Sequence, residues 1–225
     1  MSHISIAIDG PAGAGKSTLA RKLARKLGFL YVDTGAIYRT VTLKVLREKA
    51  APADPGQVVP LLEGLEIRMD YGSDGEQRMY LAGEDVSEAI RRHEVSGAAS
   101  RVSAIPEVRA FLLDYQRKLA RETDVVMDGR DIGTVVLPNA DVKIFLTAAP
   151  EARARRRLRE LEQRGEPADF DAILHDIKER DDQDEHRPIA PLRQAADAVL
   201  LDTTELNLDQ SLEALLSLVK EKIGA

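Results

Sequence analysis

A glycine-rich segment near the N-terminus has residue types and spacing suited to binding phosphate. It reads Gly10-Pro11-Ala12-Gly13-Ala14-Gly15-Lys16-Ser17-Thr18 and follows the apolar run Ile4–Ile8. Glycines let the backbone curl so that successive N–H groups point at phosphate oxygens, at the positive end of the next helix. Lys16 would then reach the β- and γ-phosphates and Ser17 would hold Mg²⁺. The alternative is a glycine-rich turn with an accidental lysine. The context argues against it, because a strand-like run precedes the loop and apolar residues at helical spacing follow it.

Polar residues follow two further apolar runs. The first run, Phe29–Val32, continues into Asp33-Thr34-Gly35-Ala36-Ile37-Tyr38-Arg39, in which Thr34 is the expected N-cap of a helix. Arg39 would meet either a phosphate or solvent. The second run, Asp124–Met127, continues into Asp128-Gly129-Arg130-Asp131. Asp128 resembles the acidic residue that positions Mg²⁺ beside a phosphate loop, and Arg130 could clamp an acceptor phosphate. A helix start decorated with Asp would explain Asp131 but not Arg130.

Two charged helical segments follow. The first places five arginines within the seven residues 153–159. It is either a solvated helix with Glu151/Arg155 and Arg156/Glu160 pairs, or a short flap that closes over a triphosphate. In the second segment Arg180, Asp184 and Arg187 are spaced to share one helix face. They form either a salt-bridge ladder or a site for a ribose phosphate.

The elements that would position these residues follow from short apolar runs suited to buried parallel strands. The runs are Ile4–Ile8, Phe29–Val32, Asp124–Met127, Val142–Leu146 and Ala198–Leu201, with helical patterns between them. They predict an α/β fold with a five-stranded parallel sheet. An inserted region is expected at about 34–110, with helices near 35–49, 88–102 and 107–121 and a hairpin of strands 65–70 and 78–82. A short lid is expected at about 151–168, all within a single domain of residues 1–225.

Composition excludes several classes of protein. The net charge of −6 makes an extended polyanion such as DNA a poor partner, so no nucleic acid is expected. With no cysteine there can be no disulfide or thiolate metal site, and the four histidines lack zinc-site spacing. No apolar stretch is long enough to cross a membrane, so we expect a cytoplasmic protein with no membrane partner.

Taken together, these segments resemble the bacterial cytidylate kinases of the nucleoside monophosphate kinase group, over nearly the whole chain. The motifs that carry the resemblance are the phosphate loop, residues 33–39, Gly83-Glu84-Asp85-Val86-Ser87, residues 128–136 and Ile177-Lys178-Glu179-Arg180-Asp181-Asp182. The resemblance implies phosphorylation of CMP or dCMP by ATP with Mg²⁺ at Ser17 and Asp128, a P-loop kinase core, an inserted monophosphate-binding region and a mobile lid. The expected partners are these small nucleotides, and the chain is expected to be a monomer.

The resemblance also assigns roles residue by residue. Arg39, Arg130 and Arg187 would bind the acceptor phosphate, with Thr34 and Tyr38 in the same binding segment. Arg180 and Asp184 would contact the ribose, and Ser100, Arg109 and Asp131 would face the cytosine. Lys16, Asp128, Arg130 and the lid arginines Arg153 and Arg157 would serve phosphoryl transfer.

Two other functions are compatible with a phosphate loop. A kinase of a small metabolite such as shikimate or gluconate would need fewer arginines than the second phosphate of a monophosphate acceptor requires. A GTPase-like switch would need an N-K-x-D motif to read guanine. The asparagines Asn139 and Asn207 are followed by Ala and Leu instead.

Overall fold

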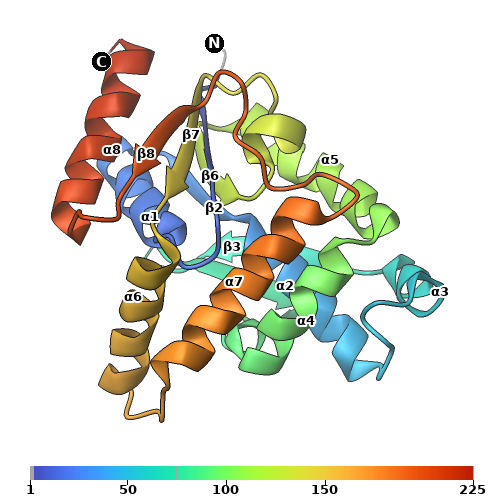
Figure 1. The fold of residues 1–225 in the computed structure, drawn as a ribbon. Coiled ribbons are helices and arrows are strands. Elements are labelled where there is room, and N and C mark those ends of the chain that lie inside the picture. The colour runs from blue at the N-terminus through green and yellow to red at the C-terminus, as the bar shows by residue number, and fades with distance from the viewer. Residues whose placement is uncertain (1–2, 74, 225) are drawn as a thin grey trace. The chain divides into compact units, whose positions relative to one another are not determined.

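Five strands form the sheet from which the phosphate-binding loop emerges (Figure 1). They are β1 (Ser5–Asp9), β2 (Leu30–Asp33), β6 (Val125–Gly129), β7 (Val142–Thr147) and β8 (Val199–Asp202), in the order β2-β6-β1-β7-β8. β1 pairs in parallel with both β6 and β7, and β7 with β8. Each strand begins and ends within two residues of its predicted position, so the predicted α/β core is confirmed.

The computed structural model describes residues 3–73 and 75–224. The chain divides into two units, one formed by Met1–Tyr31 with Glu122–Ala225 and the other by Val32–Arg121. The first boundary falls inside β2. The second unit is somewhat longer than the inserted region expected at about 34–110.

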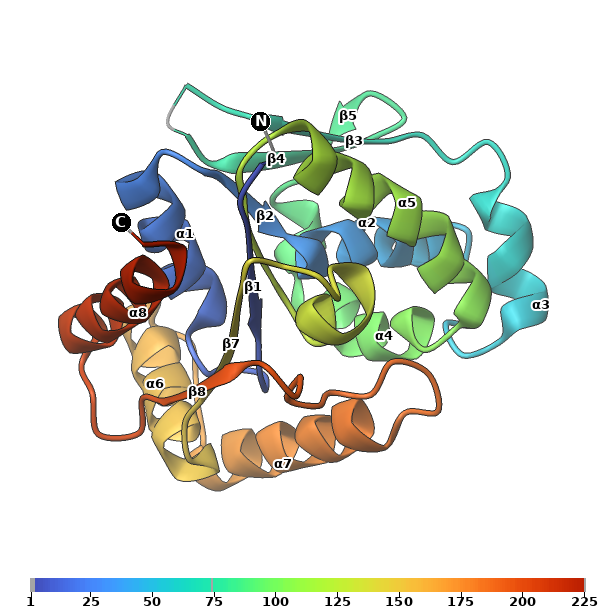
Figure 2. The ribbon, with the colours of Figure 1, turned by 90° about the horizontal axis from the view of Figure 1, so that it is seen from above.

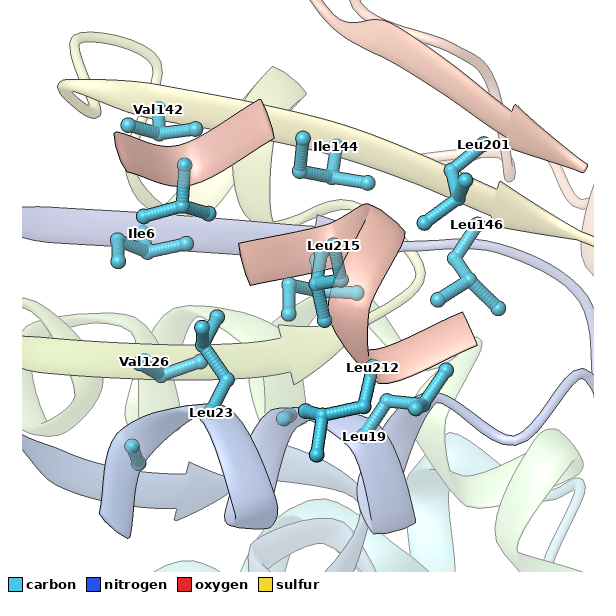
Figure 3. Packing of buried hydrophobic residues seen from close by; sticks show 14 of the residues in the cluster. Ile6, Leu19, Leu23, Val126, Val142, Ile144, Leu146, Leu201, Leu212 and Leu215 are labelled. Carbon is cyan, nitrogen blue, oxygen red and sulfur yellow. The ribbon is translucent and has the colours of Figure 1, made fainter. Parts of the chain in front are cut away.

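The core of the first unit lies between the sheet and two helices, α1 (Lys16–Leu27) and α8 (Leu208–Ile223). Figure 3 shows Leu23 of α1 and Leu215 of α8 packed beside Ile6 and Ile144 of the sheet. All four side chains are buried. Burial of each contributes about 2 kcal/mol, so this layer fixes α1, and with it the phosphate loop, on the sheet.

Two more helices of the first unit carry charged residues. α6 (Pro150–Gln163) and α7 (Phe170–His186) pack against each other, as Figure 1 shows. Between β6 and β7 lies a single π-helical turn, η3 (Ile132–Val136). α6 ends before Gly165, whose φ of 69° suits a glycine, so the helix ends within the segment 151–168 that was expected as a lid.

The second unit combines helices with a small antiparallel sheet, β3 (Ile67–Tyr71), β4 (Gln77–Leu81) and β5 (Glu84–Asp85). Figure 2 shows this sheet beside α2 (Thr34–Arg47), which also packs against α4 (His93–Ser103). α5 (Pro106–Glu122) follows α4, and a short helix α3 (Pro55–Val58) runs into the 3₁₀ turn η1 (Val59–Leu62). The predicted hairpin and the helices near 35–49 and 107–121 are confirmed.

Two expectations in this unit are wrong. The helix predicted over 88–102 is divided into the 3₁₀ turn η2 (Ala89–Arg91) and α4, because Arg92 adopts an extended conformation with ψ of 148°. The N-cap of α2 is Asp33, whose carboxylate accepts from the backbone N–H of Ala36 at 2.8 Å. Thr34 is instead the first helical residue. A carboxylate one position earlier can accept from the same unpaired N–H groups in the first turn of α2.

Candidate nucleotide-binding site

The phosphate loop has the geometry that its glycines were expected to permit. Gly13 and Gly15 adopt φ of 72° and 90°, and α1 begins at Lys16 directly after them. Gly10 has φ of 149°, and a Cβ there would lie 1.9 Å from the carbonyl oxygen of Leu146. Glycine is therefore required at Gly10 both for its conformation and for the close approach of the loop to the end of β7.

Lys16 lies inside this loop. Its side chain is buried, at 5% exposure, and Nζ donates to the carbonyl oxygen of Pro11 at 2.7 Å. Burial and the nearby positive charge of Arg130 lower the pKa of Lys16, while the carboxylates of Asp128, Asp184 and Asp9 oppose that change. A phosphate group beside Nζ would supply the negative charge that this ammonium needs.

Ser17 and Asp128 meet next to the loop. Ser17 Oγ donates to Asp128 Oδ2 at 2.8 Å, and the hydroxyl of Tyr31 donates to Asp128 Oδ1 at 2.9 Å. A hydroxyl and a carboxylate at hydrogen-bond distance form a hard oxygen donor set of the kind that holds Mg²⁺ beside substrate phosphates. The residues therefore fit the metal expected there. The contribution of Tyr31 was not anticipated, since a tyrosine within an apolar run is also typical of a strand.

A second carboxylate, Asp9, lies at the end of β1 and was assigned no role from the sequence. It is 4% exposed, and its two oxygens accept from the backbone N–H groups of Ile132 at 2.8 Å and Gly133 at 2.7 Å. No helix cap was predicted there, because the donors lie more than a hundred residues further along the chain.

Two ion pairs join the segment after β6 to Asp184 of α7 and to Arg187, the residue that follows α7. Arg130 Nε donates to Asp184 Oδ2 at 2.7 Å, and Arg187 donates to Asp131 Oδ1 at 3.1 Å. Burial raises the pKa of Asp184, but the charges of Arg130, Arg180 and Arg187 outweigh burial and hold that pKa below its usual value. The structure thus brings together four residues that the resemblance assigned to the acceptor, with Arg180 close enough to act on Asp184.

These pairs also bear on the alternative interpretations of both segments. Asp184 is paired with an arginine of another element, whereas a ladder confined to α7 would pair it with Arg180 or Arg187 alone. Asp131 makes no side-chain cap of η3. Its carboxylate pairs with Arg187, the residue that follows α7. Asp131 is still the residue at which η3 starts, because its backbone carbonyl oxygen accepts from the N–H groups of Val135 and Val136.

The two lid arginines singled out from the sequence lie in different surroundings. The side chain of Arg153 is 3% exposed and forms a two-pronged ion pair with Asp181. It also donates to the carbonyl oxygens of Ala148 and Ala12, each at 2.8 Å. Arg157 is 45% exposed and pairs with Glu160 at 3.1 Å. Arg153 therefore ties α6 to the phosphate loop and to α7, whereas Arg157 faces outward.

A third arginine of α6 reaches the same loop. Arg156 donates to the carbonyl oxygen of Thr203, at the end of β8, and to that of Ala14 at 3.4 Å. The solvated-helix interpretation predicted Glu160 as the partner of Arg156. Arg153, Arg156 and Arg157 share a helix face by spacing, and spacing alone does not say which of them turns inward.

In the second unit the predicted residues Thr34, Tyr38 and Arg39 lie in the first turns of α2. Arg39 forms an ion pair with Asp33 at 3.0 Å, and the backbone N–H of Asp33 donates to Gln77 Oε1 at 2.8 Å. The guanidinium of Arg109 lies over the ring of Tyr38, 5.5 Å from its centroid. Thr34 is buried in the first turn of α2, and Ser100 lies half-buried on α4. Gln77 had not been singled out, because its place on β4 carries no motif.

Within residues 3–73 and 75–224, no three His, Cys, Asp or Glu side chains gather as a metal-binding cluster. Over the same residues, no helix is both long and apolar enough to cross a membrane.

Comparisons with known proteins agree with the motifs. The family model described as cytidylate kinase matches residues 6–221. A cytidylate kinase of Caldicellulosiruptor bescii is 51% identical over 218 residues, covering 97% of this chain and 96% of the relative. One of Exiguobacterium sp. is 49% identical over 218 residues, covering 97% of each chain.

A solved structure shares the fold at much lower identity. The crystal structure of an uncharacterized protein from Eubacterium ventriosum aligns with a TM-score of 0.51 and 13% identity, over 99% of both chains. The likeness in fold extends along the chain as the likeness in sequence does. With a matching family model over residues 6–221 and relatives at about half identity over nearly the full length, this chain belongs to the cytidylate kinase family.

Proposed function

We propose that this protein transfers the γ-phosphoryl group of ATP to CMP or dCMP, giving ADP and CDP or dCDP. The observation that carries the proposal is membership of the cytidylate kinase family over nearly the whole chain. The first unit supports the proposal because it contains the phosphate loop, a hydroxyl and a carboxylate suited to Mg²⁺, and two arginines that are paired with carboxylates.

The phosphate loop is the proposed donor site. The loop 10–18 would hold the β- and γ-phosphates of ATP with its backbone N–H groups, and Lys16 Nζ would exchange the Pro11 carbonyl for a phosphate oxygen. Ser17 and Asp128 would hold Mg²⁺, which supplies positive charge to the phosphate oxygens. Because charge in the transferring group is the main thing to be stabilised, these residues act by electrostatics and positioning.

The proposed acceptor site in the first unit uses both members of each ion pair. The guanidinium groups of Arg130 and Arg187 would bind the acceptor phosphate, and Asp184 with Arg180 would contact the ribose hydroxyls. Asp131 would accept from the exocyclic amine of cytosine. Uracil presents oxygen lone pairs at that position, so it would be disfavoured.

Five residues of the second unit keep the roles implied by resemblance. We assign acceptor-phosphate binding to Arg39, with Thr34 and Tyr38 beside it, and recognition of the base to Ser100 and Arg109. The ion pair of Arg39 with Asp33 and the stacking of Arg109 on Tyr38 hold these cations in defined positions. Side chains that are already ordered lose less conformational entropy when a ligand binds.

Substrate choice is the direct test. ADP release should be measured by a coupled assay with ATP and, in turn, CMP, dCMP, UMP, AMP, GMP, shikimate and gluconate. We expect turnover with CMP and dCMP and much weaker turnover with the other acceptors. A higher kcat/KM for shikimate or gluconate than for CMP would overturn the proposal. The monomeric state and cytoplasmic location stay predictions.

A further inference from the structure

Asp9 holds the two amides that begin the turn after the Arg130–Asp131 segment. Its Oδ1 accepts from Ile132 N and its Oδ2 from Gly133 N, at 2.8 Å and 2.7 Å. The first N–H groups of any helical turn lack partners inside the turn, so a buried turn needs an acceptor from elsewhere. Here that acceptor is a carboxylate at the C-terminal end of β1.

The Arg130–Asp131 segment is thereby held at both ends. On one side Gly129 is the last residue of β6 and is aligned with Asp9 in the sheet register. On the other side the amides of Ile132 and Gly133 bind the side chain of the same Asp9. Only two residues lie between these fixed points, so their backbone has little room to move.

Packing beside the turn leaves little space at Gly133. A Cβ on Gly133 would lie 3.2 Å and 3.3 Å from Cδ and Cγ of Lys143, and 3.4 Å from Asp9 Oδ2. Lys143 is itself held, because its Nζ pairs with Asp197 at 2.8 Å and donates to the carbonyl oxygen of Pro138. Gly133 thus fits closely between Asp9 and the Lys143 stem.

We propose that Asp9 is the positioning residue that sets Arg130 and Asp131 for the acceptor nucleotide. The proposal rests on the proposed function, because it takes Arg130 and Asp131 as ligands of CMP. Asp9 acts through these two residues and contacts no substrate itself.

The alternative is that Asp9 only stabilises the fold, and the two roles predict different kinetics. A purely structural carboxylate would change stability and affect both substrates alike. A residue that sets Arg130 and Asp131 would change the binding of CMP selectively and weaken the choice of cytosine over uracil.

The test is Asp9→Asn, which keeps the side-chain size but turns an amide nitrogen toward one of the two N–H donors. With one buried N–H left unpaired, we expect the KM for CMP to rise about tenfold and the KM for ATP to stay within about twofold. The preference for CMP over UMP should fall as well. Equal increases in both KM values, or an unchanged KM for CMP, would overturn the proposal.

The matched control is Asp141→Asn. The Asp141 carboxylate also accepts from a backbone amide of β1, Ser5 N at 2.8 Å, but at the opposite end of the strand. The kcat and both KM values of Asp141→Asn should match those of the wild type. If Asp9→Asn fails to fold, Gly133→Ala moves the same turn while Asp9 keeps its charge, and it should give the same CMP-selective change. Equal effects on both substrates would again overturn the proposal.

Arg130→Gln separates failure of this proposal from failure of the proposed function. If Arg130→Gln raises the KM for CMP and Asp9→Asn does not, the positioning role alone is wrong. If Arg130→Gln also leaves that KM unchanged, the assignment of Arg130 to the acceptor is wrong and both fail. The double variant should be less impaired than the product of the two single effects, because both changes act on one segment.

Discussion

Arg130 and Asp184 form a hydrogen-bonded ion pair of 2.7 Å between two elements that are 54 residues apart in the chain. The pair joins the end of β6 to α7, and both side chains are largely withdrawn from solvent. A buried charge whose partner is removed pays its full desolvation cost. This pair therefore has consequences for stability as well as for the substrate.

Removal of the carboxylate tests both consequences. Asp184→Ala leaves the Arg130 guanidinium without this partner and should lower the free energy of unfolding by about 3–5 kcal/mol, measured by urea denaturation. Asp184→Asn should raise the KM for CMP more than that for dCMP, because the proposed carboxylate role is to accept from ribose hydroxyls. The control is Glu185→Ala, at an exposed neighbouring position, which should change neither the free energy of unfolding nor the KM for either nucleotide. Similar losses for CMP and dCMP would argue against contact with the 2′-hydroxyl, the group that dCMP lacks.

Lys16 tests the donor site. Lys16→Ala removes the charge that would lie on the β- and γ-phosphates, so we expect kcat to fall at least about a hundredfold while the protein stays folded. Circular dichroism would confirm the fold. Lys26→Ala, at an exposed position in the last turn of the same helix, is the control and should keep wild-type turnover. A Lys16→Ala variant with normal kcat would contradict the phosphate-loop assignment.

Substitution of Arg157 and of Arg153 should have different effects on kcat and on Tm. Arg157 is half exposed and paired only locally, so Arg157→Ala should lower kcat more than ATP affinity with little change in Tm, because it would stabilise charge that peaks in the transition state. Arg153→Ala should lower Tm clearly, since it leaves Asp181 and two carbonyl oxygens without their donor. Equal shifts in Tm would be inconsistent with these surroundings. Hydrogen exchange at 153–164 should slow when an ATP analogue and CMP are both bound.

Asp131 tests the choice of base. Asp131→Asn supplies a donor where uracil has O4 and weakens the contact with the cytosine amine, so the ratio of kcat/KM for CMP over UMP should narrow, chiefly through a lower value for CMP. Asp182→Asn, a carboxylate on the exposed side of α7, is the control. An unaltered ratio with activity retained would mean that Asp131 does not read the base.

Asp9 gives a pH dependence of stability with a defined sign. Burial raises the pKa of Asp9 from 3.8 to about 6, although its bonds to Gly133 and Ile132 oppose the increase. Between these values the folded protein holds more protons than the unfolded chain, so this group's contribution to stability falls as pH rises. The stability of the wild type relative to Asp9→Asn should decrease by up to about 3 kcal/mol between about pH 4 and pH 7, in urea unfolding. A pH-independent difference would contradict the raised pKa.

The sequence by itself determined the phosphate loop, the five strands and the arginine-bearing helices. These features depend on local spacing, because glycine conformation, strand-like apolar runs and helix periodicity act over a few neighbouring residues. Local rules nevertheless failed at two positions. Asp33 took the capping position expected for Thr34, and Arg92 interrupted a helix that the apolar pattern would have continued.

The partners of the charged residues were decided only by the tertiary structure. Helical spacing predicted one helix face for Arg180, Asp184 and Arg187, but α7 ends at His186, so Arg187 lies beyond it. The spacing also could not name Arg130 and Asp131 as the partners of Asp184 and Arg187. It did not separate the buried Arg153 from the exposed Arg157 either. Asp9 looked like the end of an apolar strand, and its acceptor role depends on amides 123 and 124 residues away. Ion pairs and hydrogen bonds between distant segments form only once packing has brought those segments together, so no local pattern records them.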